Sequence, residues 1–83
     1  MSVEIRLIGF GEERPPQFDA RNRLQVATDT PVSVRRLLQL AGVDEAPDLI
    51  AMDAETVIPP ADWDTPRIND ESTLTLLSAI EGG

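Results

Sequence analysis

Few side chains in this 83-residue chain could act as catalysts on their own. The sequence contains no Cys, His, Lys or Tyr. It therefore offers no thiolate nucleophile, no imidazole to move protons near neutral pH and no amine for a Schiff base. A chain of this length folds as one small domain without room for a deep substrate cavity. We expect a single domain over residues 1–83 that is not itself an enzyme.

The C-terminal pair Gly82-Gly83 is the feature best suited to a chemical role. Because glycine has no Cβ, a Gly-Gly end can thread a narrow channel in a partner protein. In this functional interpretation Gly82 and the free carboxylate of Gly83 enter such a channel. A flexible tail over residues 81–83 would present both. The alternative is an incidental frayed end.

Closely spaced carboxylates occur at several places in the second half of the chain. They are Asp44, Glu45 and Asp48; Asp53 and Glu55; Asp62 and Asp64; Asp70 and Glu71. A calcium-binding EF-hand loop needs Gly at its sixth position, and counting from Asp53 that position is Ile58. Carboxylate pairs that cleave glycosidic bonds need a walled cleft. We therefore expect a solvated acidic face with no metal and no bound cofactor.

The net charge of −8 is unevenly distributed, with +1 over residues 1–40 and −9 over residues 41–83. Acidic surfaces repel nucleic acids and anionic membranes, so neither is an expected partner. The acidic half would instead steer the protein toward a basic surface of an enzyme. We find no apolar run near the ~20 residues of a membrane-spanning helix and no signal peptide, which predicts a cytoplasmic protein.

The apolar pattern predicts five strands and one helix. Alternation at Val3, Ile5 and Leu7 indicates a first strand, and residues 22–28 indicate a second. Residues 33–41 predict a helix that begins after Ser33 and ends at Gly42. Residues 49–52 and 57–58 suggest a short hairpin, and residues 73–80 a last strand. The expected fold class is α+β, a mixed sheet of four or five strands with one main helix packed on one face.

Some apolar residues of the first and last strands fall on the face opposite the core. If these strands are neighbours, they form one exposed patch, which usually marks a partner site. The expected docking residues are Ile8, Phe10, Leu77, Ala79 and Ile80. For Phe10 the alternative is burial under its own loop.

Residues 59–67 read Pro-Pro-Ala-Asp-Trp-Asp-Thr-Pro-Arg and lack a helical or strand period. Trp63 is the only Trp, and Arg67 is the only base in the acidic half. We expect an ordered structural loop, with Trp63 anchored on the core and Arg67 holding the loop by a charge-assisted hydrogen bond.

The second half of the chain, with the helix before it, resembles a known family over residues 24–83. The matching residues are Val34-Arg35-Arg36-Leu37-Leu38, Asp53-Ala54-Glu55, Ile58-Pro59, Trp63, Arg67-Ile68-Asn69-Asp70, the last strand and Gly82-Gly83. This pattern resembles the ThiS/MoaD sulfur carriers, relatives of ubiquitin with a β-grasp fold, and ThiS more closely. Ala54 and Glu71 stand where that family often has Gly, and residues 9–22 are longer than in typical ThiS.

The resemblance implies a carrier that other enzymes modify. An E1-like adenylating enzyme of the ThiF/MoeB type would use ATP to adenylate Gly83. A sulfur donor such as a cysteine desulfurase or a rhodanese would then convert Gly83 to a thiocarboxylate. That group would deliver sulfur to a biosynthetic enzyme such as thiazole synthase, in thiamine biosynthesis. The partner must supply the nucleotide site and the cysteine that this chain lacks.

Other roles stay open on the sequence. A MoaD-like subunit for molybdopterin synthesis, or a carrier for another sulfur-containing metabolite, would use the same tail. A ubiquitin-like modifier would be conjugated to other proteins through Gly83. A plain binding domain would not use Gly82 and Gly83, and an acidic mimic of nucleic acid would bind basic proteins.

Overall fold

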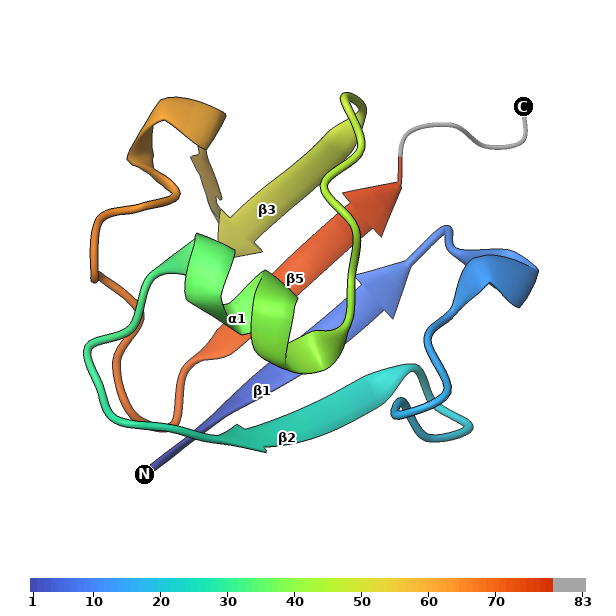
Figure 1. Cartoon of the computed structure of the whole chain (residues 1–83), viewed down its shortest axis with the longest axis horizontal. Helices are drawn as coiled ribbons and strands as arrows, with labels where there is room; N and C mark the ends of the chain where they lie inside the picture. Colours follow the sequence, from blue (N-terminus) through green and yellow to red (C-terminus); the bar gives the residue numbers. More distant parts are fainter. Residues whose placement is uncertain (79–83) are drawn as a thin grey trace.

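A computed structural model describes residues 1–78, which form an α+β domain with one five-stranded mixed sheet and one α-helix (Figure 1). The elements in chain order are β1 (Ser2–Ile8), η1 (Gly11–Glu13), β2 (Arg23–Ala27), α1 (Val34–Ala41), β3 (Leu49–Asp53), β4 (Thr56–Ile58), η2 (Pro60–Asp62) and β5 (Thr73–Ser78). Each predicted strand and the predicted helix is present with nearly the predicted bounds. The two 3-10 turns, η1 and η2, were not predicted.

The first and last strands lie side by side at the centre of the sheet. The strand order is β2-β1-β5-β3-β4. β1 and β5 are parallel, with Glu4 opposite Thr73 and Ile8 opposite Leu77, whereas the other neighbours are antiparallel. The predicted end of β5, residues 79–80, and the tail 81–83 lie outside the described residues.

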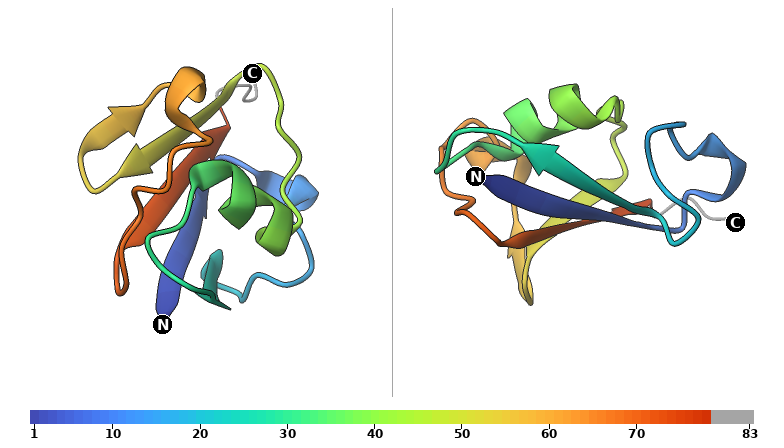
Figure 2. Two further views of the ribbon diagram at one scale, coloured as in Figure 1. Left: turned by 60° about the vertical axis from the view of Figure 1, so that its left-hand side comes forward. Right: turned by 90° about the horizontal axis from the view of Figure 1, so that it is seen from below.

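The core lies between the sheet and α1, which covers one face of the sheet (Figure 2). The inner side chains alternate along the central strands, as the period of two requires. The side chains that meet there are Val3, Ile5 and Leu7 from β1, Leu74 and Leu76 from β5, and Val34, Leu37, Leu38 and Ala41 from α1. Within residues 1–78 no other helix or strand covers the opposite face, which we call the outer face.

The ends of α1 follow the predicted punctuation. The Oγ atom of Ser33 accepts a hydrogen bond from the Arg36 backbone N at 3.1 Å, which satisfies one free donor of the first turn. Gly42 ends the helix in the left-handed conformation, with φ of 75°. No helix in the described part of the chain is long and apolar enough to cross a membrane.

The turn between β3 and β4 contains a residue under backbone strain. Asp53 pairs with Thr56, so the loop is Ala54-Glu55, and Ala54 has φ of 56°. A two-residue hairpin loop with positive φ only at its first position favours glycine there. An L-residue with a Cβ in this region costs about 1–2 kcal/mol.

We therefore expect Ala54→Gly to raise the free energy of unfolding by about 1 kcal/mol, because the strain is relieved. For a domain of this size that raises Tm by about 4–8 °C, measurable by thermal unfolding followed by circular dichroism. Glu55→Gly is the matched control, since Glu55 does not have positive φ and should gain no stability. Equal Tm changes in the two variants would contradict the assigned strain.

Candidate docking surface beside the C-terminal strand

The strand that leads to Gly82-Gly83 is the centre of the candidate site. β5 ends at Ser78, five residues before Gly83. Of the predicted docking and tail residues, Ala79, Ile80, Gly82 and Gly83 lie outside the described residues, and Ile8, Phe10 and Leu77 lie within them.

Ile8 and Leu77 are direct neighbours on the outer face, because they are partners in the parallel β1–β5 register. Leu77 is also opposite Ile50 on β3, and Met52 lies two residues further along the same face. Met52 in turn pairs with Val57 on β4. We call these five residues the apolar patch: Ile8, Ile50, Met52, Val57 and Leu77. Ile8, Ile50 and Val57 are 52%, 38% and 56% exposed, which is unusual for side chains of this size.

Three members of the apolar patch, Ile50, Met52 and Val57, were missed in the sequence analysis. The sequence does contain a signal for their common face, because a two-residue loop between two strands fixes which side chains of β3 and β4 lie on the same face of the sheet. Ile58 is buried, so Val57 must point outward. Placing this hairpin beside β5 required the strand order, which the local pattern does not specify.

Phe10 does not join the outer face. It packs against the core from the helix side and lines a cavity of about 450 Å³ together with Val43, Leu49 and Ser78. The alternation that placed Phe10 with Ile8 stops at Gly9, whose φ of 82° turns the chain. Phe10 is thus partly buried, between Pro15 of its own loop and the segment that follows α1, rather than exposed beside Ile8.

Gly9 makes a close backbone approach at the end of β5. A Cβ at this position would lie 2.9 Å from the backbone O of Ser78, closer than real Cβ contacts allow. Gly11 also has positive φ, 55°, but a Cβ there would meet no atom within 4 Å. Gly9 thus lets the loop after β1 lie directly against the residue from which the chain continues to Gly83.

Trp63 anchors the loop after η2. Its side chain is buried, and its Nε1 donates a hydrogen bond to the backbone O of Ile58 at 2.8 Å. The Arg35 guanidinium lies 6.0 Å from the centre of the Trp63 ring, and the Arg35 backbone N donates to the Trp63 O at 2.9 Å. The loop is therefore held to β4 and to the first turn of α1.

The charged contact at this loop is made by Arg35. Its Nε donates to Asp64 Oδ1 at 2.6 Å, and its Nη1 donates to Glu45. These hydrogen bonds, the one to Glu45 first, raise the pKa of Arg35 above its ordinary value. Arg67 is exposed and acts through its backbone N, which donates to the Val32 O at 3.2 Å. The charge-assisted contact expected of Arg67 is thus supplied by an arginine of α1.

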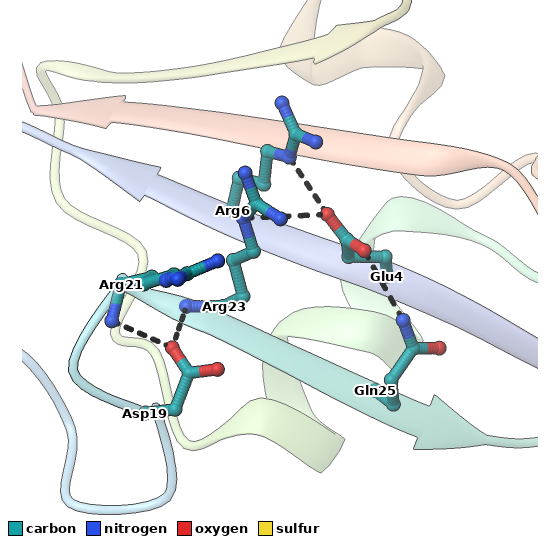
Figure 3. Close-up of polar contacts among 6 residues, drawn as sticks. All are labelled: Glu4, Arg6, Asp19, Arg21, Arg23 and Gln25. Atoms are coloured by element: carbon teal, nitrogen blue, oxygen red, sulfur yellow. Dashed lines mark hydrogen bonds and ion pairs between the residues drawn. The ribbon is translucent and has the colours of Figure 1, made fainter.

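The β1–β2 side of the outer face carries charged residues (Figure 3). Glu4 accepts a hydrogen bond from Arg6 Nε at 2.7 Å and one from Gln25 at 3.2 Å, and Arg23 Nε lies 3.9 Å away. Asp19 Oδ1 accepts hydrogen bonds from the backbone N of Arg23 and of Arg21, and these lower its pKa below the ordinary value.

The acidic residues do not form a metal centre among residues 1–78, where no three potential ligands come together. The site is instead a surface, consisting of the apolar patch, the charged side chains over β1 and β2, and the end of β5. A comparison of the sequence with models of known protein families and with curated proteins found no match.

Proposed function

We propose that this chain is a sulfur carrier with a ubiquitin-like β-grasp fold, whose C-terminal glycine is converted to a thiocarboxylate by partner enzymes. The observation that carries the proposal is the position of β5. This strand lies at the centre of the sheet, and it leads toward Gly82-Gly83 from the edge of the apolar patch. A partner that binds the patch would therefore contact the strand that precedes the reacting carboxylate.

The strand order supports the β-grasp fold. Two N-terminal strands form a hairpin, α1 crosses one face, and the last strand returns parallel to the first at the centre. This arrangement is compatible with the fold that the resemblance to the ThiS/MoaD sulfur carriers implies.

Two departures from the family pattern support the resemblance as well. Ala54 and Glu71 stand where the family often has glycine, and they have φ of 56° and 67°. Glycine adopts positive φ without the Cβ penalty, so a family would favour it at both positions. The backbone of this chain thus has positive φ at the two positions where the family often has glycine, although its own residues there are Ala54 and Glu71.

The proposed chemistry follows from the lack of nucleophilic side chains. A carboxylate is a poor electrophile, so the Gly83 oxygen first attacks the α-phosphorus of ATP and pyrophosphate leaves. The persulfide of a donor cysteine then attacks the acyl carbon of the adenylate and AMP leaves, giving an acyl disulfide. A second thiol attacks the donor sulfur of this bond, forms a disulfide with it and releases the thiocarboxylate. In this scheme the adenylating enzyme supplies the nucleotide site and the donor supplies the cysteine. We place this chemistry in the cytoplasm, where thiols stay reduced.

Reconstitution tests this proposal. The full chain, an E1-like adenylating enzyme from the same genome, ATP and sulfide should yield a species in which one oxygen is replaced by sulfur. A variant that lacks Gly82 and Gly83 should remain unmodified. Failure of every such enzyme of that genome to modify the full chain would overturn the carrier role.

The identity of the acceptor follows from the same resemblance. We propose a thiazole synthase in thiamine biosynthesis, with a molybdopterin synthase partner or another sulfur-containing metabolite as the alternative. Incubation of the thiocarboxylate form with each purified acceptor enzyme should show which one returns the carrier to its carboxylate form.

A protein modifier is the second candidate, and the absence of lysine favours it. A modifier without lysine cannot form chains through its own side chains. Conjugation would produce adducts of high molecular mass in cells, lost when Gly82 and Gly83 are deleted. A carrier alone would produce none.

A further inference from the structure

The outer face of the sheet has positive charge at one side of the apolar patch. Arg6 and Arg23 are partners in the β1–β2 register, and both are exposed there. Arg21 follows Asp19 in the loop that precedes β2 (Figure 3). We call Arg6, Arg21 and Arg23 the arginine flank. It holds three of the seven basic residues of a chain whose net charge is −8.

The carboxylates near the arginine flank do not cancel its charge. Glu4 is 21% exposed and is shared between Arg6 and Arg23. Asp19 directs one oxygen to backbone N–H groups rather than to a guanidinium. Three guanidinium groups thus face two carboxylates, which leaves donors available to a further acid.

The opposite side of the apolar patch ends at the β3–β4 loop. That loop contains the exposed Glu55, whereas Asp53 is the partner of the buried Leu74 and so lies on the inner face. The register places Arg23, Arg6, Thr75, Met52 and Val57 in one row across the five strands. The row spans roughly 19 Å, four interstrand spacings. The row therefore changes from basic on β2 and β1 to apolar on β3 and β4.

We propose that the outer face binds a partner protein that presents apolar side chains flanked by acidic ones. The acids would contact Arg6 and Arg23, and the apolar side chains would cover the apolar patch. The contact at the arginine flank would set the orientation of the partner, because a reversed partner would place its acids against Val57 and the loop that contains Glu55. The inference rests on the proposed function, since it describes the surface of the enzyme that activates Gly83. From the sequence we expected the acidic half of the chain to approach a basic surface of the enzyme. At the apolar patch the inference is different, because there the surface of the partner that complements Arg6 and Arg23 is acidic.

Two synthetic peptides test the inference directly. Both contain a central Leu-Val-Leu; one is flanked by Asp-Glu and the other by Lys-Arg. They are titrated into the isotope-labelled full chain and followed through backbone amide signals. We expect the acidic peptide to shift signals of β1, β2, β3 and β5 and to bind at least tenfold more tightly than the basic one.

Charge reversal at matched positions completes the test. Arg23→Glu should abolish the preference for the acidic peptide. Arg36→Glu makes the same change of net charge at an exposed position of α1, on the other side of the sheet. This variant should keep the preference for the acidic peptide. Equal binding of the two peptides, no binding, or shifts confined to α1 would overturn the inference.

The same variants separate this inference from the proposed function. The peptide titrations involve no ATP and no reaction at Gly83, so they give a result even if no thiocarboxylate forms. If the enzyme modifies Gly83 equally well in Arg23→Glu, Arg36→Glu and the unchanged chain, the carrier role stands and the arginine flank is not its docking contact.

Discussion

Replacing Trp63 with alanine is expected to lower the free energy of unfolding by about 3–5 kcal/mol, a large part of the 5–15 kcal/mol typical of a domain. The side chain is 3% exposed, so its removal opens a cavity in the core. The variant also loses the Nε1 hydrogen bond to the Ile58 O and the stacking of Arg35. Urea unfolding followed by far-UV circular dichroism measures the change, since the variant has no Trp fluorescence.

Trp63→Phe separates the contributions of volume and hydrogen bonding. Phenylalanine fills much of the site but cannot donate to the Ile58 O, so we expect a smaller loss of about 1–2 kcal/mol. A loss below about 1 kcal/mol in Trp63→Ala would contradict the anchoring role, because large-to-small core changes of this kind cost several times more.

Replacing Gly9 with alanine is expected to slow modification of Gly83 by about 10²-fold, because small displacements of a reacting group have effects of that size. The new Cβ would lie 2.9 Å from the backbone O of Ser78. To relieve this contact, either the loop after β1 or the end of β5 must move. Movement of β5 would displace the start of the segment that leads to Gly83. The measurement is the initial rate of thiocarboxylate formation, normalised to the folded fraction.

Gly11→Ala is the matched control, because Gly11 has a similar left-handed backbone but open space around its Cβ position. Both variants incur the strain of positive φ, about 1–2 kcal/mol. Only Gly9→Ala adds the collision with Ser78. Equal rates in the two variants would show that the contact between Gly9 and Ser78 does not position the tail.

The elements of this fold could be predicted because their signals are local. Ser33 and Gly42 mark the ends of α1 within one turn of the helix. Alternation at Val3, Ile5 and Leu7 fixed the inner face of β1, and all three side chains are buried. The sequence left open whether the first and last strands are neighbours, and the structure pairs β1 and β5 in parallel.

The site was less predictable because its contacts join residues far apart in the chain. The apolar patch needs β3 beside β5, and Arg35 meets Asp64 across 29 positions. Phe10 was misplaced by extending the alternation of β1 through Gly9, where a positive φ ends it. The sequence shows that a loop contains Gly, but the direction in which the chain leaves it depends on tertiary packing.

The proposal that Gly83 carries sulfur is tested most directly by the mass of the last residues of the chain. The full protein is co-produced with its adenylating enzyme and sulfur donor, and intact-mass analysis is followed by fragmentation. We expect one sulfur-for-oxygen exchange located at Gly83, and we expect it to be lost when the adenylating enzyme is inactive. An unmodified Gly83 in the presence of all partners, or a chain found only in conjugates with other proteins, would contradict the proposal.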